Sequence, residues 1–195
     1  MTSDSSERPI RIFAPMKNLP DIRALSFEEI EAWFLANGQQ KFRAKQVYSW
    51  LWEKGVSRFD EMSNLSKDLR QKLLESFALR GLEVADTQKS SDRTIKSAFK
   101  MYDGSVVEGV LIPTTSRMTA CISSQVGCSL TFKFCASGKL KLLRNLEAGE
   151  IYDQVVAIRR MSEENYGIPL SNIVYMGMGE PLLNYKNVLW SIDRI

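Results

Sequence analysis

The chain has 195 residues, of which 44% are hydrophobic, 25% charged and 10% aromatic, a composition that excludes a wholly disordered or fibrous protein. Its 26 basic and 23 acidic residues give a formal net charge of +3, which neither requires nor excludes a nucleic-acid partner. Histidine is absent from the sequence, so a Ser-His-Asp triad, a Cys-His pair and histidine-ligated zinc are excluded within this chain.

Three cysteines, Cys121, Cys128 and Cys135, lie within 15 residues of one another. The first residues lack the apolar run of a signal peptide, and no uninterrupted apolar stretch approaches the ~18 residues of a membrane span. We therefore expect a cytoplasmic protein with no membrane contact. In a reducing compartment, clustered cysteines more often bind metal or perform chemistry than form disulfides.

The first part of the chain is predicted to be helical. Residues 1–20 are polar and contain three prolines, which favours a flexible arm. Ser26 and Glu29 form a capping-box pattern that begins a first helix, and Asn37-Gly38 ends it. A second helix is predicted from Arg43 to Lys54, and a third follows Ser66 and ends near residue 80. These helices predict an accessory domain over residues 21–90 with a tryptophan-rich core.

The hydrophobic period then changes to that of β-strands. Residues 94–102 alternate between apolar and polar side chains, and Asp103-Gly104 is a hairpin turn signal. Residues 105–112 form the predicted return strand, which ends at Pro113. We expect a β-hairpin over residues 91–118, joined to the helices by the polar run 86–92.

From residue 119 the pattern is typical of βα units. A cysteine-rich loop at 121–138 precedes a predicted helix at 147–161, an apolar strand at 173–176, a glycine-rich turn at 177–181 and a helical start at 186. This order predicts an α/β fold with parallel strands over residues 119–195. Thiolates in so short a loop suit a soft metal or an iron–sulfur cluster, although inert small residues are the alternative.

A series of motifs follows one another along the chain: QKFRAKQVYSWL (40–51), FDEMSNL (59–65), VEGVLIP (107–113), QVGCSL (125–130), KFCASGK (133–139), RNL (144–146) and MGMGEPLLN (176–184). In content and order they closely resemble one family, the radical S-adenosylmethionine (radical SAM) RNA methyltransferases of the RlmN/Cfr type. RlmN looks closer than Cfr, and the resemblance covers about residues 20–195. It implies methylation of C2 (or C8) of an adenine in 23S rRNA and tRNA, by a partial TIM-like barrel that follows an RNA-engaging helical domain.

The resemblance also implies two cofactors, a [4Fe–4S] cluster and S-adenosylmethionine (SAM), and an external electron donor. In the family a Cys-x3-Cys-x2-Cys loop holds three irons, and SAM binds the open fourth iron. Cys128 and Cys135 match the first and third cysteines, but the middle position is Phe132, which cannot ligate iron. We therefore expect that this chain does not assemble a stable cluster.

Further site residues follow from the resemblance. Glu108 matches the acceptor of a proton from the adenine carbon, and Cys121 matches a cysteine near the substrate that helps to resolve an RNA–enzyme adduct. Gly179 and Glu180 match a turn that contacts SAM. Judged without the resemblance, alternatives stay open: Glu108 as an exposed strand residue, Cys121 as a buried small residue at a strand end, and the Gly-Met-Gly segment as an ordinary turn.

Basic residues support contact with RNA, since five of them and no acid lie between residues 109 and 146. A solvated face is the alternative explanation of such a charge run. Three more cations lie just upstream. The first set is Arg117, Lys133, Lys139, Lys141 and Arg144, and the second is Arg93, Lys96 and Lys100.

The predicted catalytic domain is short. A complete (β/α)8 barrel takes about 250 residues, whereas only 75 remain from Cys121 to the end, enough for about two βα units. The family's methyl-carrying cysteine belongs to its C-terminal third and has no counterpart here. We therefore expect a monomeric, inactive N-terminal fragment; the alternatives are a non-catalytic RNA-binding module and a non-functional gene remnant.

Overall fold

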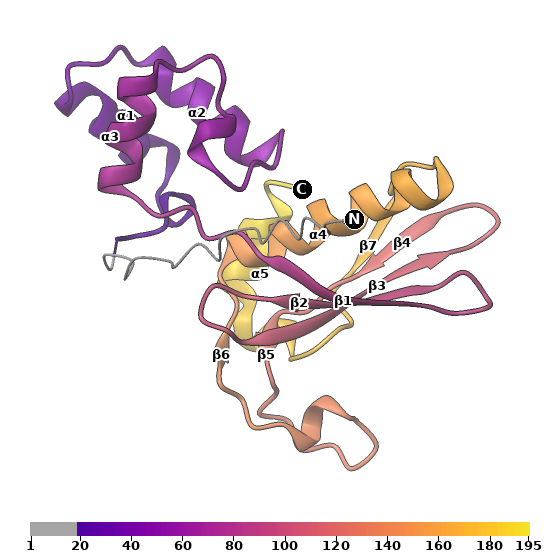
Figure 1. Ribbon diagram of the computed structural model, residues 1–195. Helices are drawn as coiled ribbons and strands as arrows, with labels where there is room; N and C mark the ends of the chain where they lie inside the picture. Colours follow the sequence, from indigo (N-terminus) through magenta and orange to yellow (C-terminus); the bar gives the residue numbers. More distant parts are fainter. Residues whose placement is uncertain (1–18) are drawn as a thin grey trace, which may run out of the picture.

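The computed structural model describes residues 19–195, which form a group of helices followed by a mixed β-sheet with two further helices (Figure 1). All but two residues of the predicted N-terminal arm lie outside the described residues. Together these elements form a mixed α/β fold, as the sequence predicted. Within the described residues, no helix has the length and hydropathy needed to cross a membrane.

The helical part begins as the capping signal predicts. The Ser26 hydroxyl accepts a hydrogen bond from the Glu29 amide at 3.2 Å, and the Glu29 carboxylate accepts one from the Ser26 amide at 2.7 Å. Apolar side chains at helical spacing, including Phe34 and Leu51, meet in one core, against which Trp33 and Trp50 also pack. The elements are η1 (Ile22–Ala24), α1 (Phe27–Ala36), α2 (Phe42–Trp52), η2 (Phe59–Glu61) and α3 (Lys67–Ser76).

The sheet has five strands in the order β1-β2-β3-β4-β7, and only the last pair is parallel. The predicted hairpin is present as β2 and β3. The prediction of a polar joint at 86–92 was wrong in part, because residues 83–89 form strand β1, exposed along its whole length. The strands are β1 (Glu83–Lys89), β2 (Ile95–Lys100), β3 (Val106–Pro113), β4 (Met118–Cys121) and β7 (Asn172–Val174).

Helix α4 (Ala148–Tyr166) packs on one face of this sheet and forms the second core with it. A Cβ atom at Gly109 would lie 2.4 Å from the ring of Phe99 and 3.1 Å from Ile158, so a side chain at this strand position would force the Phe99 ring to move. The opposite face of β3 carries the exposed Glu108. The remaining elements are β5 (Gln125–Val126), η3 (Ser137–Lys139), β6 (Arg144–Asn145), η4 (Pro181–Asn184) and α5 (Tyr185–Ile192).

The helical part is joined to the sheet through α4. Tyr152 and Val156 of α4 belong to the core of the helical part, and the Tyr152 hydroxyl donates to the Trp52 carbonyl. The buried Arg23 of η1 donates to Asp153 of α4 at 2.6 Å. One long helix therefore contributes to both cores.

Candidate functional site

The segment that follows Cys121 and the glycine-rich turn meet where the two parallel strands end. Past the end of β4, the amide of Ile122 donates to Val174 of β7 at 3.0 Å, and the amide of Gly177 donates back to Ile122 at 3.0 Å. The amide of Ser124 then donates to Met178 at 2.9 Å. The cysteine-bearing segment and the glycine-rich turn are thus hydrogen-bonded neighbours. Crevices at the carboxyl ends of parallel strands are the usual ligand sites of such sheets.

Glu108 and Cys121 lie on the sheet face opposite α4. Strand register pairs Val110 with Cys121, and Glu108 lies two residues before Val110 on the same face of β3. The Lys96 ammonium lies 2.6 Å from the Glu108 carboxylate, and both side chains are about half exposed. Burial raises the pKa of the Cys121 thiol, so this thiol is protonated near neutral pH.

Ser123 ties these elements together. Its buried hydroxyl donates to the Glu108 carbonyl at 2.6 Å and accepts from the Met178 amide at 2.8 Å. The buried Gln154 side chain of α4 accepts from the Ser123 amide and donates to its carbonyl. Sequence reasoning missed Ser123 and Gln154, because the segment after Cys121 was expected to be a loop and its polar residues were not expected to be buried.

The glycine-rich turn packs directly on Gln125. Gly179 has a φ of +91°, and a Cβ atom there would lie 2.5 Å from the Gln125 Cβ. The Glu180 amide donates to the Gln125 side chain at 2.9 Å, while the Glu180 carboxylate accepts from the Leu182 amide at 3.0 Å and caps η4. Packing alone therefore accounts for the glycine, and the role of Gly179 and Glu180 in contacting SAM stays a prediction.

The cysteine loop places two thiols close in sequence to an exposed phenylalanine. Cys128 is buried, and its sulfur accepts a hydrogen bond from the Leu130 amide at 3.4 Å. Cys135 donates its amide to the Phe132 carbonyl at 3.1 Å, so these two residues share one turn. The Phe132 side chain is 52% exposed and stacks on Phe134, with ring centroids 5.4 Å apart.

The donors in this loop do not fit a [4Fe–4S] cluster. Three thiolates are needed to leave one iron open, and the loop offers Cys128 and Cys135 only, with a phenyl ring at the middle position. Among residues 19–195, no group of three or more cysteine, histidine or carboxylate side chains is arranged to hold a metal ion. The described residues of this chain therefore lack the thiolate set that such a cluster requires.

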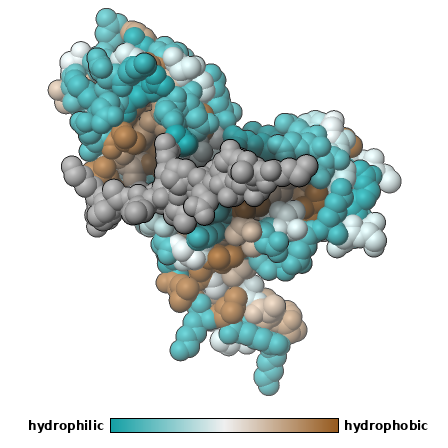
Figure 2. All heavy atoms as spheres, viewed as in Figure 1, coloured by the Kyte–Doolittle hydropathy of each residue, from teal (hydrophilic) through white to brown (hydrophobic). Residues whose placement is uncertain are grey.

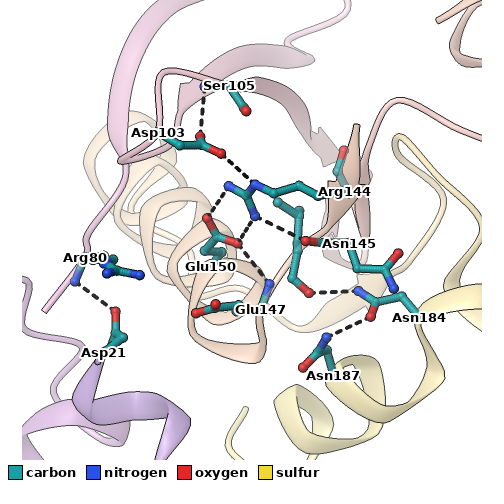
Figure 3. Close-up of polar contacts among 12 residues, drawn as sticks. Asp21, Arg80, Asp103, Ser105, Arg144, Asn145, Glu147, Glu150, Asn184 and Asn187 are labelled. Carbon is teal, nitrogen blue, oxygen red and sulfur yellow. Dashed lines mark hydrogen bonds and ion pairs between the residues drawn. The ribbon is translucent and has the colours of Figure 1, made fainter. Parts of the chain in front are cut away.

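Arg144, one of the predicted RNA-binding cations, is paired with two carboxylates of the chain itself (Figure 3). It donates to Asp103 at 2.6 Å and makes a bidentate pair with Glu150 at 2.7 and 2.8 Å. Glu150 also accepts from the Glu147 amide at 2.9 Å, which caps α4. The Arg144 guanidinium lowers the pKa of Asp103 to about 2. This arginine therefore holds the turn of the hairpin to the start of α4.

The other four cations of the run are exposed, at Arg117, Lys133, Lys139 and Lys141. Figure 2 shows hydrophilic side chains reaching from the lower part of the molecule beside hydrophobic ones. The hydrophobic residues of this loop include Phe132, Phe134 and Leu143, all exposed. A surface that combines exposed cations with exposed aromatic rings suits nucleic acid.

Comparisons with known proteins find that the chain is similar to RNA methyltransferases. Residues 17–79 match the family model described as "Ribosomal RNA large subunit methyltransferase N-terminal domain". A "Probable dual-specificity RNA methyltransferase RlmN" of Flavobacterium psychrophilum is 55% identical over 90% of this chain and 50% of that protein. The protein of the same name from Cytophaga hutchinsonii is 56% identical over 89% of this chain and 48% of its own length.

The chain is also similar to a solved structure of a methyltransferase. A radical SAM methyltransferase from Sphaerobacter thermophilus matches with a TM-score of 0.80 and 38% identity, over 90% of this chain and 51% of that one. The resemblance to RlmN is confirmed. The fold is correspondingly part of a radical SAM methyltransferase fold, and the chain spans about half the length of the RlmN relatives that it matches.

Proposed function

We propose that this chain is the RNA-engaging and site-framing part of an RlmN-type radical SAM methyltransferase that acts on C2 of adenine in 23S rRNA and tRNA. The observation that carries the proposal is the hydrogen-bonded junction between the segment after Cys121 and the turn at 177–181, with Glu108 on the adjoining sheet face. The relatives named RlmN, each described as a dual-specificity RNA methyltransferase, support RNA as the substrate class. We expect the chain to act as a monomer in the cytoplasm.

In this proposal Glu108 accepts a proton from the substrate adenine. A carboxylate performs this task when it is ionised and within hydrogen-bond reach of the reacting carbon. The Lys96 ammonium, 2.6 Å from the Glu108 carboxylate, holds that carboxylate in place on the sheet face. Cys121 lies on the same face and is the thiol available to the bound adenine, while Gly179 and Glu180 line the side where SAM, the methyl donor, would bind.

We further propose that the chain is inactive as it stands, because Phe132 removes one of three cluster ligands. The test is anaerobic reconstitution with iron and sulfide, with iron and acid-labile sulfide measured per chain. The unaltered chain should retain no stable cluster, whereas Phe132→Cys should retain one. Phe134→Cys adds a thiol to the same loop at the wrong spacing and should behave like the unaltered chain. A SAM-responsive cluster in the unaltered chain would refute the proposal.

A non-catalytic RNA-binding module is the second candidate. The incomplete thiolate set and the exposed cations Lys133, Lys139 and Lys141 favour it. Such a module would bind RNA with an affinity that falls strongly as salt rises. It would not turn over SAM when an external electron donor is added. If Phe132→Cys also fails to take up iron and sulfide while RNA binding persists, this second function is the better description.

A further inference from the structure

A groove on the surface of the helical part lies outside the candidate site. It has a volume of about 300 Å³ and runs along α2 to the segment before α3. None of the residues that line it belongs to the sheet or to the cysteine loop. Its lining includes Phe42, Trp50, Lys45, Lys54, Gln46 and Asn64.

Two aromatic rings and two cations give this groove its character. The Trp50 indole N–H donates to the Asn64 side chain at 2.6 Å, which fixes the ring, and the Lys54 ammonium lies 3.5 Å from the ring centroid. Phe42 is 47% exposed and has the Arg43 guanidinium 4.8 Å from its ring centroid. Trp50 is only partly exposed and packs against the helical core, so Phe42 is the exposed ring of the groove. An exposed aromatic ring beside cations forms a stacking platform for a nucleobase whose phosphates the cations neutralise.

The charged residues of the neighbouring helices α1 and α2 have opposite signs. Helix α2 contains Arg43 and Lys45 and no acid, whereas α1 contains three glutamates and no cation. The lining of the groove holds two lysines and no carboxylate. Ser49 also lines the groove, and its hydroxyl donates at 2.6 Å to the carboxylate of Glu53, which follows α2 and is not itself part of the lining. The groove therefore presents positive charge next to flat apolar surfaces, which complements an unpaired nucleotide.

We propose that this α2 groove binds one unpaired nucleotide of the RNA, with the base stacked on Phe42 and its phosphates held by Lys45 and Lys54. The volume of about 300 Å³ is at the small end of ligand pockets and suits a single nucleotide. This inference rests on the proposed function, because it takes RNA as the partner. It adds a recognition point on the helical part, separate from the sheet face that carries Glu108.

The test measures the affinity of the full chain for a fluorescein-labelled single-stranded RNA and for the same RNA in a duplex. Phe42→Ala should weaken single-strand binding by about 5- to 150-fold, the range for losing one base stack. Lys45→Gln with Lys54→Gln should reduce the salt slope of log K by about 1.4, because each phosphate contact contributes about 0.7 on single strands. Duplex binding should change less.

Matched controls use exposed residues of α3. Leu74→Ala removes an exposed apolar side chain, and Lys67→Gln with Lys72→Gln removes the same charge as the groove pair. Both controls should leave single-strand affinity within about twofold of the unaltered chain, because these residues lie outside the groove. Circular dichroism of every variant confirms that the helices are intact.

The outcomes separate this proposal from the proposed function. Equal effects of the groove and control variants would refute the groove, as would failure of the unaltered chain to bind single-stranded RNA. A groove variant that weakens binding of an acidic peptide but not of RNA would also refute it. The reconstitution of Phe132→Cys is unaffected by any of these results, so the methyltransferase reading is judged independently.

Discussion

Arg23 offers the sharpest test of how the helical part is held to α4. Its side chain is 2% exposed and donates to Asp153 at 2.6 Å, to the Arg80 carbonyl at 2.8 Å and to the Gly149 carbonyl at 3.3 Å. Asp21, also buried, lies 3.4 Å from the same guanidinium. A single buried cation therefore compensates the buried Asp21 and the Asp153 carboxylate, which is 11% exposed, from different parts of the chain.

Arg23→Met keeps much of the apolar stem and removes the charge. Asp21 and Asp153 then remain buried without a counter-charge, and breaking a buried pair in this way costs about 3–5 kcal/mol. That is a large share of the ~5–15 kcal/mol that stabilises a typical domain. Adding Asp153→Asn to Arg23→Met removes one of the stranded charges, so it should recover at least about 1 kcal/mol.

Urea unfolding followed by circular dichroism measures these changes at constant salt and pH. Arg58→Met is the matched control, because Arg58 pairs with Asp60 on the surface and both side chains are at least 60% exposed. Removing this surface pair should cost no more than about 1 kcal/mol. If Arg23→Met costs as little as Arg58→Met, or if Asp153→Asn lowers stability equally with and without Arg23, the buried ion pair does not hold the helical part to α4.

Three other substitutions test the site and its frame. Gly179→Ala places a Cβ 2.5 Å from Gln125 at a φ of +91°, so urea unfolding should show a loss of about 1–3 kcal/mol; a neutral result would contradict the close packing. Ser123→Ala leaves a buried amide and a carbonyl without partners, with a similar expected loss in the same assay. Asp103 has a pKa of about 2, below its ordinary 3.8, because Arg144 favours its ionised form. The stability that the ionised Asp103 contributes, about 1–2 kcal/mol, is therefore fully present above about pH 4 and is lost as pH falls to about 2. Over that window the difference in unfolding free energy between the unaltered chain and Asp103→Asn should shrink. A constant difference would count against the ion pair.

Elements with local signals were predictable from the sequence. The capping box at Ser26, the turn at Asp103-Gly104 and the apolar period of α4 each depend on residues a few positions apart, and each element is present. Strand β1 was missed because all seven of its residues are exposed, so it carries no apolar alternation. Its pairing with β2 depends on backbone hydrogen bonds, which leave no pattern in the side chains.

The site was predictable only in its motifs. The resemblance singled out Glu108 and Cys121, but it could not show that β3 and β4 place them on one face. Ser123 and Gln125 were missed because their partners lie 15 to 55 residues away, in β3, the glycine-rich turn and β6. Likewise, Arg144 looked like an RNA-binding cation until its pairing with Asp103, 41 residues distant, was seen. Side chains whose partners are distant in sequence leave no periodic signal.

Phe132 lies outside the buried hydrogen bonds that stabilise the site, so a substitution there can change the ligands of the loop without destabilising the fold. The frame of the site is held by Ser123, Gln125 and Gln154, which are buried and hydrogen-bonded to neighbouring segments without any metal. Phe132, by contrast, is half exposed and contacts Phe134 within its own loop. A cysteine at this position would therefore alter the ligand set of the loop while costing the fold little, within the ~0.5 kcal/mol typical of surface substitutions. If instead Phe132→Cys changes the unfolding free energy by several kcal/mol, the loop contributes to the frame, and the loss of a cluster ligand could not have been neutral for folding.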